Sequence, residues 1–187
     1  TAEVTRWSFA AHREAALDGH IREVEALRDE LSLSSRHAAV TDELLASLDG
    51  DAREHPLPEG RGAALRNEPF RRKAEHMLAR LRSLRAGEGK GDGYDAARYR
   101  EDLDLLHRAL MQAGFESVAR HGRLQRARVL AWTFGFHLAA LDVRQHSAVH
   151  EGVGAWLLRA AGVEADYLGL EEEARVSLLE RERRTPR

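Results

Sequence analysis

The chain has 187 residues, of which 43% are hydrophobic and 32% charged, and its formal net charge at pH 7 is −2. This balance gives no electrostatic reason to expect a nucleic-acid partner, and the lack of cysteine excludes disulfides, thiolate catalysis and cysteine-based zinc sites. No apolar run approaches the roughly 20 residues of a membrane-spanning helix, and the first residues do not resemble a secretory signal. We therefore expect a cytoplasmic protein of one ordinary domain or a little more.

The first part of the chain has a helical apolar period. Residues 2–31 place apolar side chains mostly three and four apart, which predicts one long helix with a single apolar stripe. Residues 41–43 (TDE) are expected to open a short second helix, which Gly50 closes just past Leu48. Residues 51–62 contain two prolines and two glycines and are therefore expected to form a loop.

A third helix is expected to start near Asn67 or Glu68, because Pro69 is tolerated in a first helical turn. The sequence from Arg61 to Arg85 is rich in arginine. Such a stripe can bind nucleic acid, but no aromatic side chains interleave with it. We interpret these arginines as a solvated face.

Residues 86–94 alternate glycine with charge and predict a flexible surface linker. Helices are expected over residues 95–113 and 117–133. On the first of these, Asp102 and Asp104 are expected to face water rather than to act as an acid–base pair.

The period changes at residues 136–143, a short run of mainly apolar residues that Gly135 precedes and Arg144 follows. Such a run fits a strand buried on both faces, although a buried helical segment has the same pattern. A helix over residues 147–161 would complete a strand–helix unit, and parallel α/β folds handle ligands at the carboxyl ends of their strands. Arg144 is thus the best candidate for chemistry, either as a fixed cation for phosphate or carboxylate or as a simple partner of Asp142 or a helix end.

His146 and His150 lie four residues apart, which is metal-ligand spacing on a helix, and His137 is near in sequence. Zinc would need a further ligand, and no HExxH glutamate is present. We expect no metal site here, but a zinc-binding module remains a testable alternative.

Residues 134–151 (FGFHLAALDVRQHSAVHE) resemble the LDxRQ segment of bacterial phosphoenolpyruvate carboxylase. Further similarities follow in the family's order at residues 1–5, Arg13, residues 30–36 (ELSLSSR), residues 68–71 (EPFR, with Phe70 for the usual tyrosine) and residues 166–168. The resemblance implies an internal piece of a several times longer enzyme, which begins after the family's GDRDGNP loop and stops before its later glycine-rich loop.

The resemblance also implies an activity, in which phosphoenolpyruvate is carboxylated with bicarbonate to oxaloacetate and phosphate. It implies a magnesium cofactor whose ligands lie outside this piece and a homo-oligomeric parent. From charge and hydropathy we expect no nucleic-acid or membrane partner. Arg144 is implied to grip the substrate phosphate, as both the catalytic and the substrate-binding residue. No chemical step is assigned to Gln145 or Ser147, and His146 departs from the family's usual glutamate or asparagine, so its role is open.

The expected fold is therefore mainly α: a helical bundle over residues 1–133 and a strand–helix segment over residues 134–187, derived from a (β/α)8 barrel. We expect the piece alone to be inactive. The rival hypothesis is a non-catalytic helical interaction domain.

Overall fold

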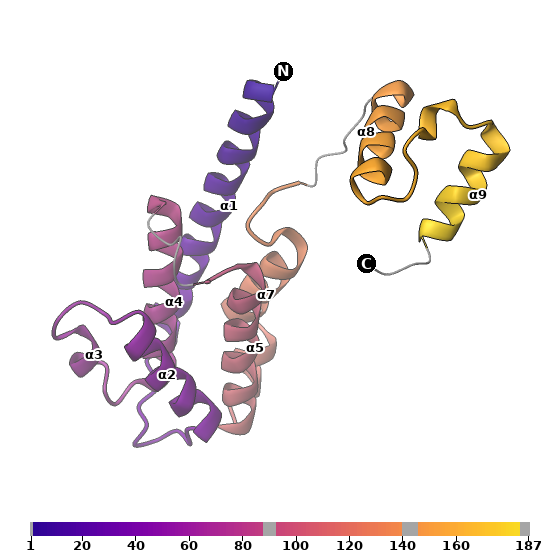
Figure 1. The fold of residues 1–187 in the computed structure, drawn as a ribbon. Helices are drawn as coiled ribbons and strands as arrows, with labels where there is room; N and C mark the ends of the chain where they lie inside the picture. The colour runs from indigo at the N-terminus through magenta and orange to yellow at the C-terminus, as the bar shows by residue number, and fades with distance from the viewer. Residues whose placement is uncertain (1, 88–92, 140–145, 184–187) are drawn as a thin grey trace. The chain divides into compact units, whose positions relative to one another are not determined.

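The computed structural model describes residues 2–87, 93–139 and 146–183, which form helices joined by turns and loops and contain no strand. The chain divides into two compact units, Thr1–Ala140 and Leu141–Arg187 (Figure 1). None of the described helices is both long and apolar enough to cross a membrane.

The first unit consists of helices of very different length. They are α1 (Ala2–Glu30), α2 (Asp42–Glu54), α3 (Arg61–Ala64), α4 (Pro69–Ala86), α5 (Ala96–Gln112), α6 (Glu116–Arg120) and α7 (Arg123–Phe134). The predicted long first helix is confirmed, and so is the helix expected to start near Asn67 or Glu68, which begins at Pro69. Of the expected linker, residues 88–92 lie outside the described residues.

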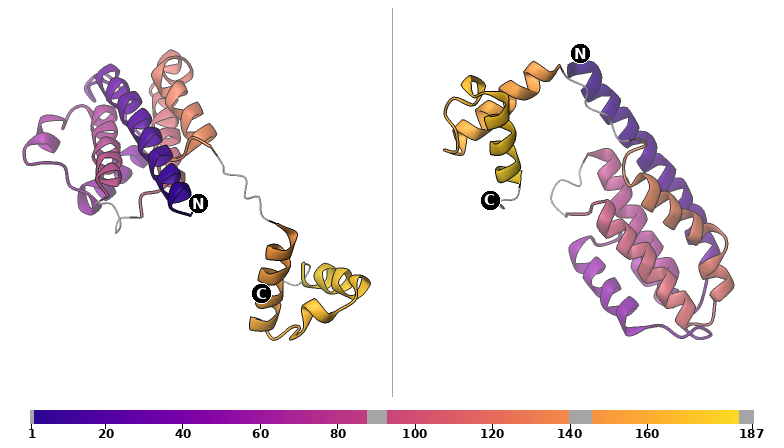
Figure 2. Two further views of the ribbon diagram at one scale, coloured as in Figure 1. Left: turned by 90° about the horizontal axis from the view of Figure 1, so that it is seen from above. Right: turned by 90° about the vertical axis from the view of Figure 1, so that its right-hand side faces the viewer.

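Helix α1 is the longest helix of the first unit and packs against two others. It packs along α4 and α7, while α5 contacts α2, α4, α6 and α7, and Figure 2 shows α1 running beside both of its neighbours. The stripe of Leu17, Val24, Leu27 and Leu31 is buried, because residues three, four and seven apart share one helical face. Helix α1 thus supplies one side of the core.

Helix α2 begins as predicted but ends later. Thr41 is its N-cap and accepts a hydrogen bond from the Leu44 amide, at 3.2 Å. The prediction that Gly50 ends the helix is wrong, because the helix continues to Glu54. Interior glycine costs about 1 kcal/mol of helix propensity, and Asp51 in the extra turn makes buried ion pairs that offset this cost.

The single helix predicted over residues 117–133 is wrong as well. Gly122 has φ +91° and ψ −150°, and it separates α6 from α7. This conformation is open to glycine and costly for residues with a Cβ. The chain therefore turns at Gly122 before α7 packs on α1.

The strand expected over residues 136–143 is not formed in the part of it that is described. Residues 135–138 make a turn and a bend after α7, and the His137 amide donates to the Phe134 carbonyl at 3.0 Å. Residues 140–143 lie outside the described residues. A strand needs a neighbouring strand to satisfy its backbone groups, and the described residues offer none.

The second unit contains α8 (Ser147–Ala160), the 3-10 turn η1 (Tyr167–Gly169) and α9 (Glu172–Arg183). Its core consists of Leu158, Tyr167 and Leu178. Helix α8 confirms the helix predicted over residues 147–161. It ends at Ala160, shortly before Gly162, which has φ +67°.

Candidate functional site

The candidate site residue Arg144 lies outside the described residues, as do Asp142 and Gln145. The structure describes the two flanks of the segment that carries it. One flank is the turn after α7, and the other is the start of α8.

The turn after α7 is held by a side chain from α1. His20 Nε2 lies 2.6 Å from the Gly135 carbonyl oxygen, and since a carbonyl only accepts, the ring donates from Nε2. The rings of His20, Tyr99 and Phe136 pack together with centroids 5.0 to 5.9 Å apart. Three elements thereby fix the point at which the chain leaves α7.

His20 occupies a site that disfavours its charged form. Only 3% of the residue is exposed, and burial lowers the pKa of the imidazole, against the opposing effects of the Gly135 carbonyl and Glu23. A neutral His20 with its proton on Nε2 keeps the hydrogen bond to Gly135. The ring is therefore a structural donor at neutral pH.

On the other flank, His146 caps α8. Its Nδ1 accepts from the Ala148 amide at 3.3 Å, so this ring serves the helix start. Within the described ranges, no three His, Asp or Glu side chains are grouped closely enough to hold a metal ion.

A buried ionic cluster joins α2, α4 and α5. Lys73 Nζ lies 2.7 Å from Asp51 Oδ2 and 2.5 Å from Asp102 Oδ1, and Arg80 reaches Asp51 at 3.1 Å. Tyr94 donates its hydroxyl to Asp102 at 2.8 Å. Burial first, and then the negative Asp102, raise the pKa of Tyr94 well above its usual range.

This cluster corrects two expectations. The arginine-rich α4 is not simply a solvated face, because Lys73 and Arg80 are at most 1% exposed. Asp102 faces inward rather than water and is paired with Lys73, while Asp104 is partly buried and paired with Arg128 at 2.7 Å. Lys73, Arg80 and Arg128 thus join helices of the first unit through these ion pairs.

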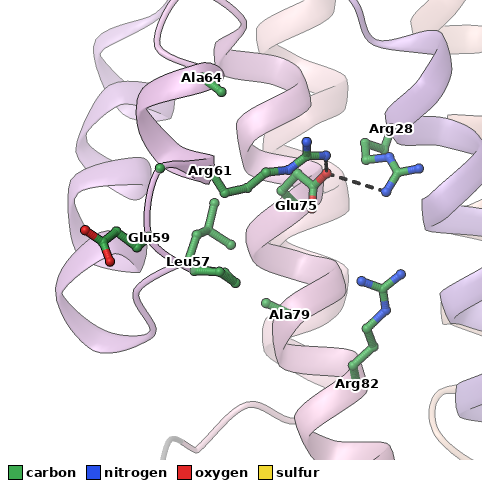
Figure 3. Close-up of a pocket in the computed structure, with 10 residues that line it drawn as sticks. Arg28, Leu57, Glu59, Arg61, Ala64, Glu75, Ala79 and Arg82 are labelled. Carbon is green, nitrogen blue, oxygen red and sulfur yellow. Dashed lines mark hydrogen bonds and ion pairs between the residues drawn. The ribbon is translucent and has the colours of Figure 1, made fainter.

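A hollow of about 760 Å³ lies where α3 and the loop before it meet α4 and α1 (Figure 3). Arg28 and Arg61 converge on one oxygen of Glu75, which is only 8% exposed as a side chain. Arg82 also lines the hollow and pairs with Glu25 at 2.5 Å. The Arg61–Glu75 pair thus joins α3 to α4, and the other two pairs join α1 to α4.

Helical spacing could have revealed two of the residues that the sequence reasoning missed. His20 lies three residues after Leu17 and four before Val24, on the buried stripe of α1. Lys73 lies between Phe70 and Met77 at the same spacing on α4. A polar residue within an apolar stripe predicts a buried partner, although the sequence does not name that partner.

Comparison with known proteins gives one consistent result. The family model for phosphoenolpyruvate carboxylase matches residues 1–187. A phosphoenolpyruvate carboxylase of Rhodothermus marinus is 47% identical over 191 residues, covering 100% of this chain and 20% of the relative. One from Azorhizobium caulinodans is 39% identical over 204 residues, covering 100% and 21%. The chain spans about a fifth of the length of the curated relatives it matches.

Proposed function

Because this chain belongs to the phosphoenolpyruvate carboxylase family, we propose that it is one part of a longer enzyme that carboxylates phosphoenolpyruvate with bicarbonate, giving oxaloacetate and phosphate. The observation that carries the proposal is the match over all 187 residues to relatives about five times as long. The rival, a non-catalytic helical interaction domain, has no comparable support.

In this proposal Arg144 binds the phosphate of the substrate. A guanidinium is permanently charged and can donate two parallel hydrogen bonds to phosphate oxygens. In a site closed to water, such a cation stabilises the charge that develops as phosphate leaves. Support comes from the LDVRQ motif that contains Arg144.

The same proposal explains why residues 136–143 have strand character in sequence. A strand buried on both faces needs neighbours on each side, and a (β/α)8 barrel provides them. The remaining four fifths of the longer enzyme would contribute those neighbours. The turn at residues 135–138 would then be the place where the helical region meets the barrel.

Magnesium is part of the proposal only through the family. By the family resemblance its ligands would lie outside this chain, and among the described residues no three acidic or histidine side chains are grouped to hold a metal ion. The chain alone is expected to be inactive, because one arginine without its partner cations stabilises a transition state by only a few kcal/mol. Cytoplasmic location and a homo-oligomeric parent belong to the same proposal.

The test uses the Rhodothermus marinus carboxylase with its matching fifth replaced by this chain. We expect Arg144→Ala to lower kcat/KM for phosphoenolpyruvate by about 100-fold or more, the cost of losing one donor to developing charge. Arg144→Lys keeps the charge but loses the paired donors, so it should recover only part of the kcat/KM that Arg144→Ala loses. Arg126→Ala is the control, since that side chain is 68% exposed and pairs with Glu23 on α1. If the chain served only as an interaction domain, none of these substitutions would lower the activity of the hybrid enzyme.

A further inference from the structure

Two adjacent residues, Gly135 and Phe136, connect the turn after α7 to α1 and α5. The Gly135 carbonyl accepts a hydrogen bond from His20 Nε2 of α1 at 2.6 Å. The Phe136 ring packs on the rings of His20 and of Tyr99 on α5, with centroids 5.9 and 5.7 Å apart. Of these groups, imidazole is the one whose ordinary pKa lies near neutral pH. The contact between the turn and α1 therefore includes a group that can change its charge.

The other ring nitrogen of His20 is not prepared to carry a proton. Nδ1 is buried and has no hydrogen-bond partner among the described residues. In the neutral ring this nitrogen is an acceptor, because the proton lies on Nε2. Protonation would make it a donor on a charged ring, and a buried charged donor without an acceptor is strongly disfavoured. The closed turn therefore favours neutral His20.

The polar groups around the ring do not compensate for this charge. Glu23 of α1 pairs through Oε1 with Arg126 of α7 at 3.0 Å, and its Oε2 is buried and not bonded to Nδ1. The Tyr99 hydroxyl is buried and not bonded to Nδ1 either, and burial first, then the charge of Glu23, raise the pKa of Tyr99 far above neutral. Burial lowers the pKa of His20 more than the Gly135 carbonyl and Glu23 raise it.

His137 is a second titratable side chain close to Gly135. Its Cε1 would lie 3.6 Å from a Cβ atom placed on Gly135. The side chain is exposed, so it can take up a proton without any movement of the turn. The His137 amide donates to the Phe134 carbonyl at 3.0 Å and lies inside the turn. This amide therefore reports whether the turn is closed.

We propose that His20 and Gly135 form an acid-sensitive latch, which holds the turn at residues 135–138 on α1 while His20 is neutral and releases it when His20 is protonated. The release is a local opening in which the helices of the first unit stay folded. In the open turn the imidazole reaches water and titrates near its ordinary pKa of about 6.5. Below that pH the open state binds one more proton than the closed state, so the opening equilibrium rises by up to about tenfold per pH unit. This inference goes beyond the proposed activity and does not depend on it.

The experiment measures amide hydrogen exchange by NMR in the 187-residue chain, at pH values on both sides of about 6.5. The protection factor of the His137 amide is expected to be constant above this pH and to fall by up to about tenfold per pH unit below it. The His20 ring signals should show the Nε2–H tautomer above this pH, and the ring should gain its second proton as the amide loses protection.

Two variants separate the latch from general acid unfolding. His20→Gln keeps an amide donor that can reach Gly135 but does not titrate, so it should remove the pH dependence of the His137 amide. His76→Gln is the matched control, because His76 lies on α4 and burial lowers its pKa as well. A local opening of the turn leaves His76 buried, so this control should leave the pH dependence unchanged.

Four results would overturn the proposal. The His137 amide could lack protection at neutral pH, or its pH dependence could survive in His20→Gln. The pH dependence could weaken in His76→Gln, which would assign it to unfolding of the whole unit. Finally, the His20 ring could gain its second proton while the His137 amide stays protected, which would mean that the closed turn accepts the charge. This last measurement uses the unchanged chain and decides the question even if His20→Gln does not fold.

Discussion

Replacing Lys73 by Met should destabilise the first unit severely. The side chain is 1% exposed and its ammonium lies 2.7 Å from Asp51 and 2.5 Å from Asp102. Methionine fills a similar volume but leaves two buried carboxylates without their shared cation, and of these two carboxylates Arg80 pairs with Asp51 alone. Removing one partner of a buried pair costs about 3–5 kcal/mol, so we expect a loss of that size.

The loss is measured by urea unfolding of the 187-residue chain, followed by circular dichroism. Arg108→Ala is the matched control, because Arg108 and Glu43 form a pair whose side chains are about half exposed, 49% and 56%, and such pairs contribute about 0–1 kcal/mol. Adding Asp102→Asn to Lys73→Met should recover part of the loss by removing one orphaned charge. A Lys73→Met loss no larger than that of Arg108→Ala would refute the reasoning.

Four other substitutions test local features of the first unit. Burial lowers the pKa of His20 and His76 in the folded chain. As the pH drops below about 6.5, the unfolded chain therefore binds more protons than the folded chain, and the free energy of unfolding should fall. His20→Gln should weaken this pH dependence, and an unchanged pH profile of the variant would contradict the role of His20. Thr41→Ala should cost about 1 kcal/mol in urea unfolding through loss of the α2 cap, and no loss would exclude the cap. Gly50→Ala should stabilise the folded chain by about 0.5–1 kcal/mol, since open space surrounds the position of the added Cβ in the helix. Gly122→Ala should destabilise the folded chain, because Gly122 has φ +91°. Equal effects of the two substitutions would show that backbone conformation does not decide their outcome.

Much of the helical fold is predictable because its signals are local. The stripe on α1 and the positions of Thr41 and Pro69 each depend on neighbouring residues, and the structure confirms all three. The end of α2 is different, because Asp51 is held by Lys73, which lies 22 residues further on. A contact of this kind overrides local propensity and has no local signal.

In the candidate site, too, local signals were predictable and contacts between distant residues were not. The motif around Arg144 suggested a family, and the comparisons confirm that family, whereas the strand expected in residues 136–143 is absent from its described part. Strand formation depends on partners that are far away in the sequence or outside it. The role of His20 in holding Gly135 was missed for a related reason, since 115 residues separate the two groups.

The central claim is that this chain is a working part of a phosphoenolpyruvate carboxylase. The most direct test replaces the matching fifth of the Rhodothermus marinus enzyme with this chain and measures oxaloacetate formation that depends on both phosphoenolpyruvate and bicarbonate. We predict substantial activity in the hybrid and none in the 187-residue chain alone. A folded hybrid without activity, or activity that survives Arg144→Ala unchanged, would contradict the account.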